Sequence, residues 1–315
     1  MSNHRLICWS IAGIAALGLT ATVWAEGEPQ GIFDHIAVNP SLDSYGDQEM
    51  PGSRPTAPGG PYNLFTNPAP RDFRRPLAPE PHPYTTEPGR VQVELDLLRF
   101  TYDRHNPERD NVRMRAWKLP VTVKLGVLHN VDFQVGMQAF TWEREDDLDA
   151  GTRTSVSGFG DITLRSKINL WGNDEDLEHA FAMTPFLQLP TARHDAGIGR
   201  VQGGVMLPFA WVFAEGWELE WTPHLAAIRD SPDERYALEA GSLLVFNRVI
   251  VEDLEGFLEF EAIGATERGS RWAGLINTGL TYELTADTIL EGGVGLGVTR
   301  AADDFTAYIT MVQRF

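Results

Sequence analysis

The sequence predicts an all-β protein, a closed antiparallel transmembrane β-barrel of about twelve strands preceded by an irregular segment rich in proline. From Gly89 onward, apolar and polar residues alternate with period two in segments of about 10 to 15 residues, and helical periodicity is almost absent. The polar face of several segments carries charged residues, which a soluble sandwich would not bury. Because lipid offers no hydrogen-bond partner for the backbone, a sheet that crosses a membrane must close on itself.

Residues 1–25 have the pattern of a secretory signal peptide. Arg5 precedes the apolar run LICWSIAGIAALGLTATVW, and Val23 and Ala25 suit positions −3 and −1 of a signal-peptidase site. An uncleaved membrane anchor is the alternative, but the Ser, Thr and Gly content of the run and the cleavage site favour removal. The single cysteine, Cys8, lies inside this signal, so the mature chain is expected to contain no disulfide. A secreted chain of this kind needs a large core or a closed hydrogen-bonded sheet.

The region between the signal and the predicted barrel, residues 26–88, holds 13 of the 20 prolines and shows no sustained periodicity. It is expected to be either a flexible periplasmic leader or a plug-like segment that packs against the barrel through its aromatic residues. Removal of the signal leaves 25 basic and 44 acidic residues, an excess of negative charge that argues against nucleic acid as a partner.

The predicted barrel covers residues 89–315. Twelve alternating segments are expected, although ten or fourteen strands stay open because segment boundaries are uncertain by a few residues. In the segment GDITLRSKINLW, four aliphatic residues fall on one face and five polar residues, two of opposite charge, on the other. The twelve segments are 91–103, 113–126, 130–143, 159–171, 178–190, 201–214, 217–229, 235–249, 254–266, 271–284, 287–299 and 304–315.

The connections between these segments also alternate. Odd-numbered connections, such as HNPERDN and TARHDAGIGR, are charged and sometimes long, whereas even-numbered ones such as AEG and LTAD are tight. Short turns on one rim and polar loops on the other are typical of bacterial outer-membrane barrels, whose short turns face the periplasm. Aromatic residues near the strand ends fit the two membrane interfaces: Tyr102, Trp117, Trp142, Trp171, Trp217, Trp272, Tyr282 and Tyr308.

The inward-facing polar residues are the best candidates for function, because charged side chains in a water-filled lumen tune selectivity. The alternative is that they pair across a narrow lumen and block it. No histidine spacing typical of a metal site is present, and no cofactor, metal or catalytic residue is expected. The predicted pore-lining residues are Glu94, Asp96, Asp161, Arg165, Lys167, Glu218, Glu220, His224, Glu259 and Glu261.

The stretch GFGDITLRSKINLW, followed by AFAMTPFLQLPTAR, resembles the outer-membrane β-barrel transporter family of the meta-cleavage pathway of phenol degradation. The upstream stretch NPAPRDFRRPLAPEPHPYTTEPGRVQVELDLLRFTYDR resembles the part of that family that leads into its first strand, so the similarity spans most of residues 67–315. The chain departs from the family at Ala78-Pro79-Glu80-Pro81, where members commonly carry Asp-Arg-Pro, and at Ala192, where they often carry Gly.

The resemblance implies an outer-membrane channel or transporter of a Gram-negative cell, for passive or facilitated passage of small molecules such as aromatic or other hydrophobic compounds. Its expected partners are outer-membrane lipid, the barrel-assembly machinery and a small-molecule solute. Two alternatives stay open. One is a structural or adhesive barrel with a closed lumen. The other is an outer-membrane phospholipase, although the chain contains no Gly-x-Ser-x-Gly motif and is not expected to be an enzyme.

The last eleven residues, FTAYITMVQRF, are predicted to form the final strand, and the terminal Phe315 resembles the C-terminal signature that the barrel-assembly machinery recognises. Phe305, Ala307, Ile309, Met311 and Phe315 are expected to face lipid, with Thr306, Thr310 and Arg314 turned inward and Gln313 interrupting the apolar row.

Deletion of Phe315 is therefore expected to impair assembly before it affects any transport. The measurement is the amount of heat-modifiable barrel in outer-membrane fractions, and normal assembly of the truncated chain would contradict the assignment.

Overall fold

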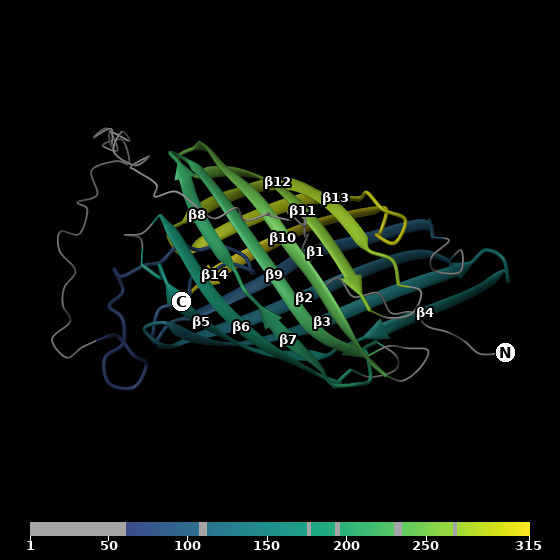
Figure 1. Cartoon of the computed structure of the whole chain (residues 1–315), viewed down its shortest axis with the longest axis horizontal. Coiled ribbons are helices and arrows are strands. Elements are labelled where there is room, and N and C mark those ends of the chain that lie inside the picture. The colour runs from purple at the N-terminus through teal and green to yellow at the C-terminus, as the bar shows by residue number, and fades with distance from the viewer. Residues whose placement is uncertain (1–60, 107–111, 175–177, 193–195, 230–234, 267–269) are drawn as a thin grey trace, which may run out of the picture. The chain divides into compact units, whose positions relative to one another are not determined.

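The computed structural model in Figure 1 describes residues 61–106, 112–174, 178–192, 196–229, 235–266 and 270–315. The predicted signal peptide, residues 1–25, and residues 26–60 of the proline-rich region lie outside the described residues. Within the described part of the chain, no helix is long and apolar enough to cross a membrane.

Fourteen β-strands follow one another along the described chain. Their bounds are β1 (Val91–Asn106), β2 (Val112–Leu128), β3 (Val131–Asp147), β4 (Thr152–Gly158), β5 (Ile162–Trp171), β6 (His179–Leu189), β7 (Gln202–Met206), β8 (Phe209–Ala214), β9 (Trp217–Arg229), β10 (Tyr236–Val251), β11 (Leu254–Ala265), β12 (Ala273–Thr285), β13 (Thr288–Gly297) and β14 (Phe305–Arg314).

The strands form one closed antiparallel sheet of twelve positions, which confirms the predicted fold class and strand count. Closure runs through β14 and β1, which pair from Gln92 opposite Arg314 to Tyr102 opposite Phe305. On the other side of the barrel, β10 pairs with both β9 and β11. Each of the twelve positions therefore has hydrogen-bonding neighbours on both sides, as a sheet in lipid requires, and only β4, which pairs with β3 alone, has a single neighbour among the described strands.

Two positions of the barrel are shared by two strands each. Strands β4 and β5 pair with successive stretches of β3, so the expected loop over residues 143–158 is instead a hairpin. Its turn is held by Asp147 Oδ1, which accepts hydrogen bonds from the amides of Asp149 (3.0 Å) and Ala150 (2.8 Å), and by Gly151 at φ +64°. The expected strand 201–214 is interrupted between β7 and β8 at Pro208, which has no N–H for the ladder.

Alternation along each strand separates an inner polar face from an outer apolar one. On β9, Thr222 and His224 are buried, whereas Trp221 and Leu225 are 46% and 45% exposed. Strand β1 changes face through a bulge after Asp96, so that Leu97 and Leu98 are both exposed. Tyr308 is an exception to the predicted aromatic belt, because it packs beside the buried residues Leu243, Val245 and Phe257 on the inner wall.

Residues 61–90, called here the N-terminal segment, lead into β1 from the rim of short turns. Four of the turns on this rim contain two residues each, at 129–130, 215–216, 252–253 and 286–287. The segment lies close to β2, because the Gly89 amide donates to the Gly126 carbonyl (3.0 Å) and the Gly126 amide to the Arg90 carbonyl (3.1 Å). A Cβ at Gly126 would lie 2.0 Å from the Glu87 carbonyl oxygen, so this contact requires glycine.

The substitution Gly126→Ala is expected to loosen the N-terminal segment without preventing barrel formation, because the overlap is with the segment's backbone. The measurement is limited trypsin cleavage after the buried Arg90, whose carbonyl accepts the Gly126 amide; this cleavage should become about tenfold faster or more. Gly136→Ala is the matched control, since its Cβ would meet nothing closer than 3.5 Å. Equal protection of the Gly126 variant and the wild type would contradict this contact.

Candidate functional site

Glu80 of the N-terminal segment lies at the centre of a buried charge cluster inside the barrel. Its Oε1 atom is 2.6 Å from Lys124 Nζ on β2 and 2.6 Å from Lys167 Nζ on β5. The lysine side chains are 1% and 0% exposed. Glu94 on β1 forms a further ion pair with Lys124. The cluster therefore joins the N-terminal segment to three strands of the barrel wall.

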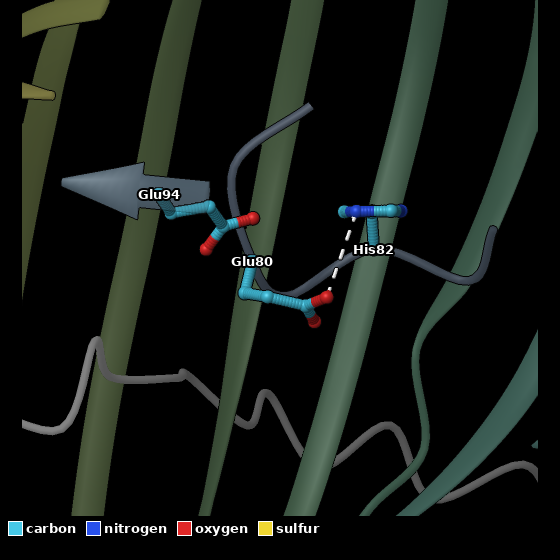
Figure 2. A group of neighbouring side chains, drawn as sticks. All are labelled: Glu80, His82 and Glu94. Carbon is cyan, nitrogen blue, oxygen red and sulfur yellow. Dashed lines mark ion pairs between the residues drawn. The ribbon is translucent and has the colours of Figure 1, made fainter. Parts of the chain in front are cut away.

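Figure 2 shows Glu80, His82 and Glu94 converging, with one ligand atom of each within 4.8 Å of the others. This geometry could hold a metal ion, but the Lys124 ammonium already contacts all three side chains, including His82 Nε2 at 3.3 Å. A second cation in the same place would meet Lys167 as well, which repels it. The lysine therefore supplies the positive charge that the carboxylates need, and these residues do not fit a metal site.

Burial acts against ionisation of Glu80, but the ammonium groups of Lys124 and Lys167 outweigh it and hold the pKa of this carboxyl well below its usual range. Burial and the neighbouring Lys167 lower the pKa of His82, so the imidazole is neutral at pH 7. Removing one partner of such a buried pair leaves an uncompensated charge, which costs about 3–5 kcal/mol. The cluster is therefore a strong constraint on the position of the segment.

Further contacts hold the remainder of residues 80–88 against the inner wall. The Thr86 amide donates to Asp132 Oδ2 (2.9 Å), and Asn169 Nδ2 donates to the Pro83 carbonyl (3.0 Å). Tyr84 reaches towards β9, where its hydroxyl lies 3.5 Å from Glu218 Oε1. Since β9 is six positions from β1 around the barrel, this contact indicates that the segment extends across the lumen.

A second cluster ties the segment to the end of the last strand. Arg314 Nη1 donates to Glu87 Oε1 (2.7 Å), and both residues are buried. Arg314 also pairs with Asp287 in the turn between β12 and β13 (3.0 Å), as does Arg74 (3.2 Å). Hydrogen bonding from Arg74 and Arg314 lowers the pKa of Asp287 to about 2. The stabilisation from this pair is therefore present above about pH 4 and lost as the pH falls towards about 2.

On the inner wall formed by β9 to β13, three carboxylates accept hydrogen bonds from neutral groups rather than from lysine or arginine. Glu220 accepts from Asn247 (2.8 Å), Glu259 from Asn277, and Glu291 from Thr281 (3.1 Å). An apolar patch formed by Leu243, Val245, Phe257 and Tyr308 lies on the same wall. Within this patch, Val245 lies opposite Glu220 on β9 and Glu259 on β11.

The predicted pore-lining residues fall into four environments. Glu94 and Lys167 belong to the Glu80 cluster, and Asp96 is buried between Thr310 (2.7 Å) and Arg99. Asp161 accepts hydrogen bonds from the amides of Ala192 (2.9 Å) and Ile198 (2.8 Å), so it orders the connection between β6 and β7. The remaining six are partly buried or buried on inward positions of β5, β9 and β11: Arg165, Glu218, Glu220, His224, Glu259 and Glu261.

Sequence reasoning missed Glu80, Lys124 and Arg314 as members of the site. Lys124 stands on the polar face of VTVKLG, and Arg314 was predicted to face inward, so alternation contained a signal for both. Glu80 lies in the proline-rich region, where no periodicity indicates which residue meets the barrel.

Residues 53–315 match the family model described as the putative MetA-pathway of phenol degradation. The chain belongs to this family. The match confirms the family to which the sequence resemblance pointed. No curated protein matches the chain.

Among solved structures, the COG4313 outer membrane channel from Pseudomonas putida F1 is 12% identical, with a TM-score of 0.60, and the match covers 76% of this chain and 100% of that one. It shares the outer-membrane β-barrel fold. The NanC porin is 12% identical at a TM-score of 0.45, covering 70% of this chain and 98% of its own. The TodX monoaromatic hydrocarbon channel, in a deltaS2 mutant form, is 9% identical with a TM-score of 0.40, and the match covers 71% of this chain and 89% of that one.

The substitution Glu80→Gln is expected to weaken attachment of the segment, because Lys167 loses its carboxylate partner while remaining buried. Opening of residues 84–87 should become easier by about 3–5 kcal/mol. The measurement is hydrogen–deuterium exchange at these amides in the detergent-solubilised barrel. Glu252→Gln, in an exposed two-residue turn, is the control. Unchanged exchange in the Glu80 variant would show that the ion pairs do not hold the segment.

Proposed function

We propose that this protein conducts small solutes passively through the outer membrane, along the inner wall formed by β9 to β13. The observation that carries the proposal is the division of the lumen. The charge cluster of the N-terminal segment lies against β1, β2 and β5, whereas Glu220, Glu259 and Glu291 on β9, β11 and β13 have neutral hydrogen-bond partners. Carboxylates that are not consumed by ion pairs attract cations and water into a lumen.

The proposed solutes include aromatic and other hydrophobic compounds. Two observations support this class: the family description refers to phenol degradation, and the inner wall carries the apolar patch of Leu243, Val245, Phe257 and Tyr308. Aromatic rings favour contact with such side chains in offset or edge-to-face geometry. A solute could therefore exchange contacts with apolar and carboxylate groups along one wall.

In this proposal the predicted pore-lining residues have three different roles. Glu218, Glu220, His224, Glu259 and Glu261 line the passage, and Arg165 faces it from the β5 side of the lumen. Glu94, Asp96 and Lys167 hold the opposite wall and the N-terminal segment, which acts as a plug that narrows the passage. Asp161 shapes the loop between β6 and β7. We also propose the organisation expected from the sequence, which is a cleaved signal over residues 1–25, a periplasmic or plug-like segment over 26–88 and a barrel over 89–315.

Catalysis is not part of the proposal. A phospholipase needs a nucleophile and a base that a lipid can reach, whereas His224 is buried on the inner face with its Nε2 atom 3.2 Å from Glu239. The structural or adhesive barrel would differ from a channel by the absence of conductance. We also propose that Phe315, which is 71% exposed at the end of β14, is recognised by the barrel-assembly machinery.

Wild-type protein in a planar bilayer is expected to conduct ions and to prefer K⁺ over Cl⁻ at pH 7, as the reversal potential in a KCl gradient would show. The double variant Glu220→Gln/Glu259→Gln should reduce this preference, because it removes two carboxylates from the passage. Glu252→Gln, outside the lumen, is the control and should leave the preference unchanged. No measurable current from the folded protein would refute the channel and favour the closed structural barrel.

A further inference from the structure

Four arginines gather on the outer face of β2, β3 and β4, near the rim of long loops. This outer arginine patch consists of Arg113, Arg115, Arg144 and Arg153. Arg115 lies directly opposite Arg144 in the ladder between β2 and β3, and Arg153 on β4 lies opposite Asp146 on β3. Figure 1 shows the hairpin of β3 and β4 running beyond the ends of neighbouring strands. The patch therefore spans three strands that are hydrogen-bonded to one another, β2, β3 and β4.

Burial along the strands shows that the patch faces outward. Met114 and Ala116 are 7% and 0% exposed, so the inner face of β2 carries the even-numbered residues there, while Trp117 on the other face is 41% exposed. On β3, Thr141 is buried and Phe140 exposed, which places Arg144 on the same side as Phe140. Arg113, Arg115 and Arg144 therefore share the face that meets lipid nearer the middle of the barrel.

The patch adjoins a row of aromatic side chains on that same face. Trp117 lies opposite both Phe100 on β1 and Trp142 on β3, and the rings of Phe100 and Trp117 are 4.7 Å apart. Arg115 and Arg144 are two residues further along their strands, a rise of about 7 Å. Aromatic rows of this kind mark the membrane interface, so the arginines lie at the level of the lipid headgroups.

The charge of the patch is positive in a chain whose net charge is −18. Asp146 is the carboxylate on its face, and it pairs with Arg153 (2.6 Å) and Arg144 (3.3 Å). Arg113 Nε has no hydrogen-bond partner among the described residues, and Arg115 lies over the Tyr102 ring, 6.0 Å from its centroid. The carboxylates of Glu143 and Asp147 belong to the opposite face of the sheet, where Glu143 lies near Lys118 (4.0 Å).

We propose that the outer arginine patch binds phosphate groups of the phosphorylated glycolipid in the outer leaflet. Guanidinium groups form bidentate, charge-assisted hydrogen bonds with phosphate oxygens, which lysine does less well. The ligand is a membrane lipid rather than free phosphate, because the patch is continuous with the lipid-facing aromatic row. A lipid bound there would place its acyl chains against Trp117 and Trp142 and its phosphates against Arg115 and Arg144.

The experiment titrates the full-length mature protein, folded in detergent, with diphosphorylated lipid A and counts bound lipid by native mass spectrometry. The variant is Arg115→Gln/Arg144→Gln, which keeps a polar, hydrogen-bonding side chain but removes both charges. Arg248→Gln is the matched control, since this exposed arginine also stacks on an aromatic ring, that of Trp217 (5.0 Å), but at the rim of short turns. Heat modifiability confirms that each variant is folded.

Wild type and the Arg248 variant are expected to bind the lipid equally, and the double variant about tenfold or more weakly. Enzymatic removal of the lipid phosphates should abolish the difference between the three proteins. Equal binding of wild type and the double variant would overturn the proposal, as would equal affinity for lipid A lacking its phosphates. Displacement of the lipid by an equal concentration of inorganic phosphate would also overturn it, because it would mark a site for free anions.

Discussion

The structure depends on closure of the sheet, because a backbone surrounded by lipid must find all its hydrogen-bond partners within the protein. Pairing of β1 with β14 and of β9 with β10 completes that closure. Closure also separates two environments with opposite requirements. Outward positions carry residues such as Trp221 and Leu225, and inward positions carry Lys124, Lys167 and Asp132. The polar inner wall is thus a direct consequence of the period-two pattern acting on a closed sheet.

Charges enclosed by the barrel need partners, and the N-terminal segment supplies them. Lys124 and Lys167 are almost completely buried, and Glu80 provides the carboxylate that they share. Arg314, at the end of the last strand, is compensated by Glu87 of the same segment. The segment therefore supplies counter-charges to β1, β2, β5 and β14, while Glu220, Glu259 and Glu291 on the other wall have neutral hydrogen-bond partners. In the proposed function, this division makes the first wall structural and leaves the second for passage.

Much of the fold followed from the sequence, because period-two alternation and turn length are local properties. They predicted the twelve positions of the barrel, the two kinds of rim and the inward orientation of Lys167 and Arg314. The bulge after Asp96, which turns both Leu97 and Leu98 outward, was not predicted, although these adjacent leucines shift the apolar residues of the segment from odd to even positions. The role of Glu80 could not be predicted, because its lysine partners are distant in sequence and proline-rich regions carry no periodicity. Tyr308 was predicted to lie at the membrane interface because it is aromatic. However, it stands two residues from the inward-facing Thr310, and residues two apart on a strand share a face, so this spacing indicates the inner wall.

Buried ion pairs hold residues 80–88 inside the barrel, and the chain allows a direct test of this attachment. Its single cysteine, Cys8, lies in the predicted signal, so one introduced cysteine would be the sole thiol of the mature protein. The measurement compares the labelling rates of Thr85→Cys and Thr66→Cys with a bulky, water-soluble maleimide in the folded protein. Thr85 is buried and Thr66 exposed, so Thr66→Cys should react readily and Thr85→Cys at least tenfold more slowly. Equal rates at the two positions would contradict the account.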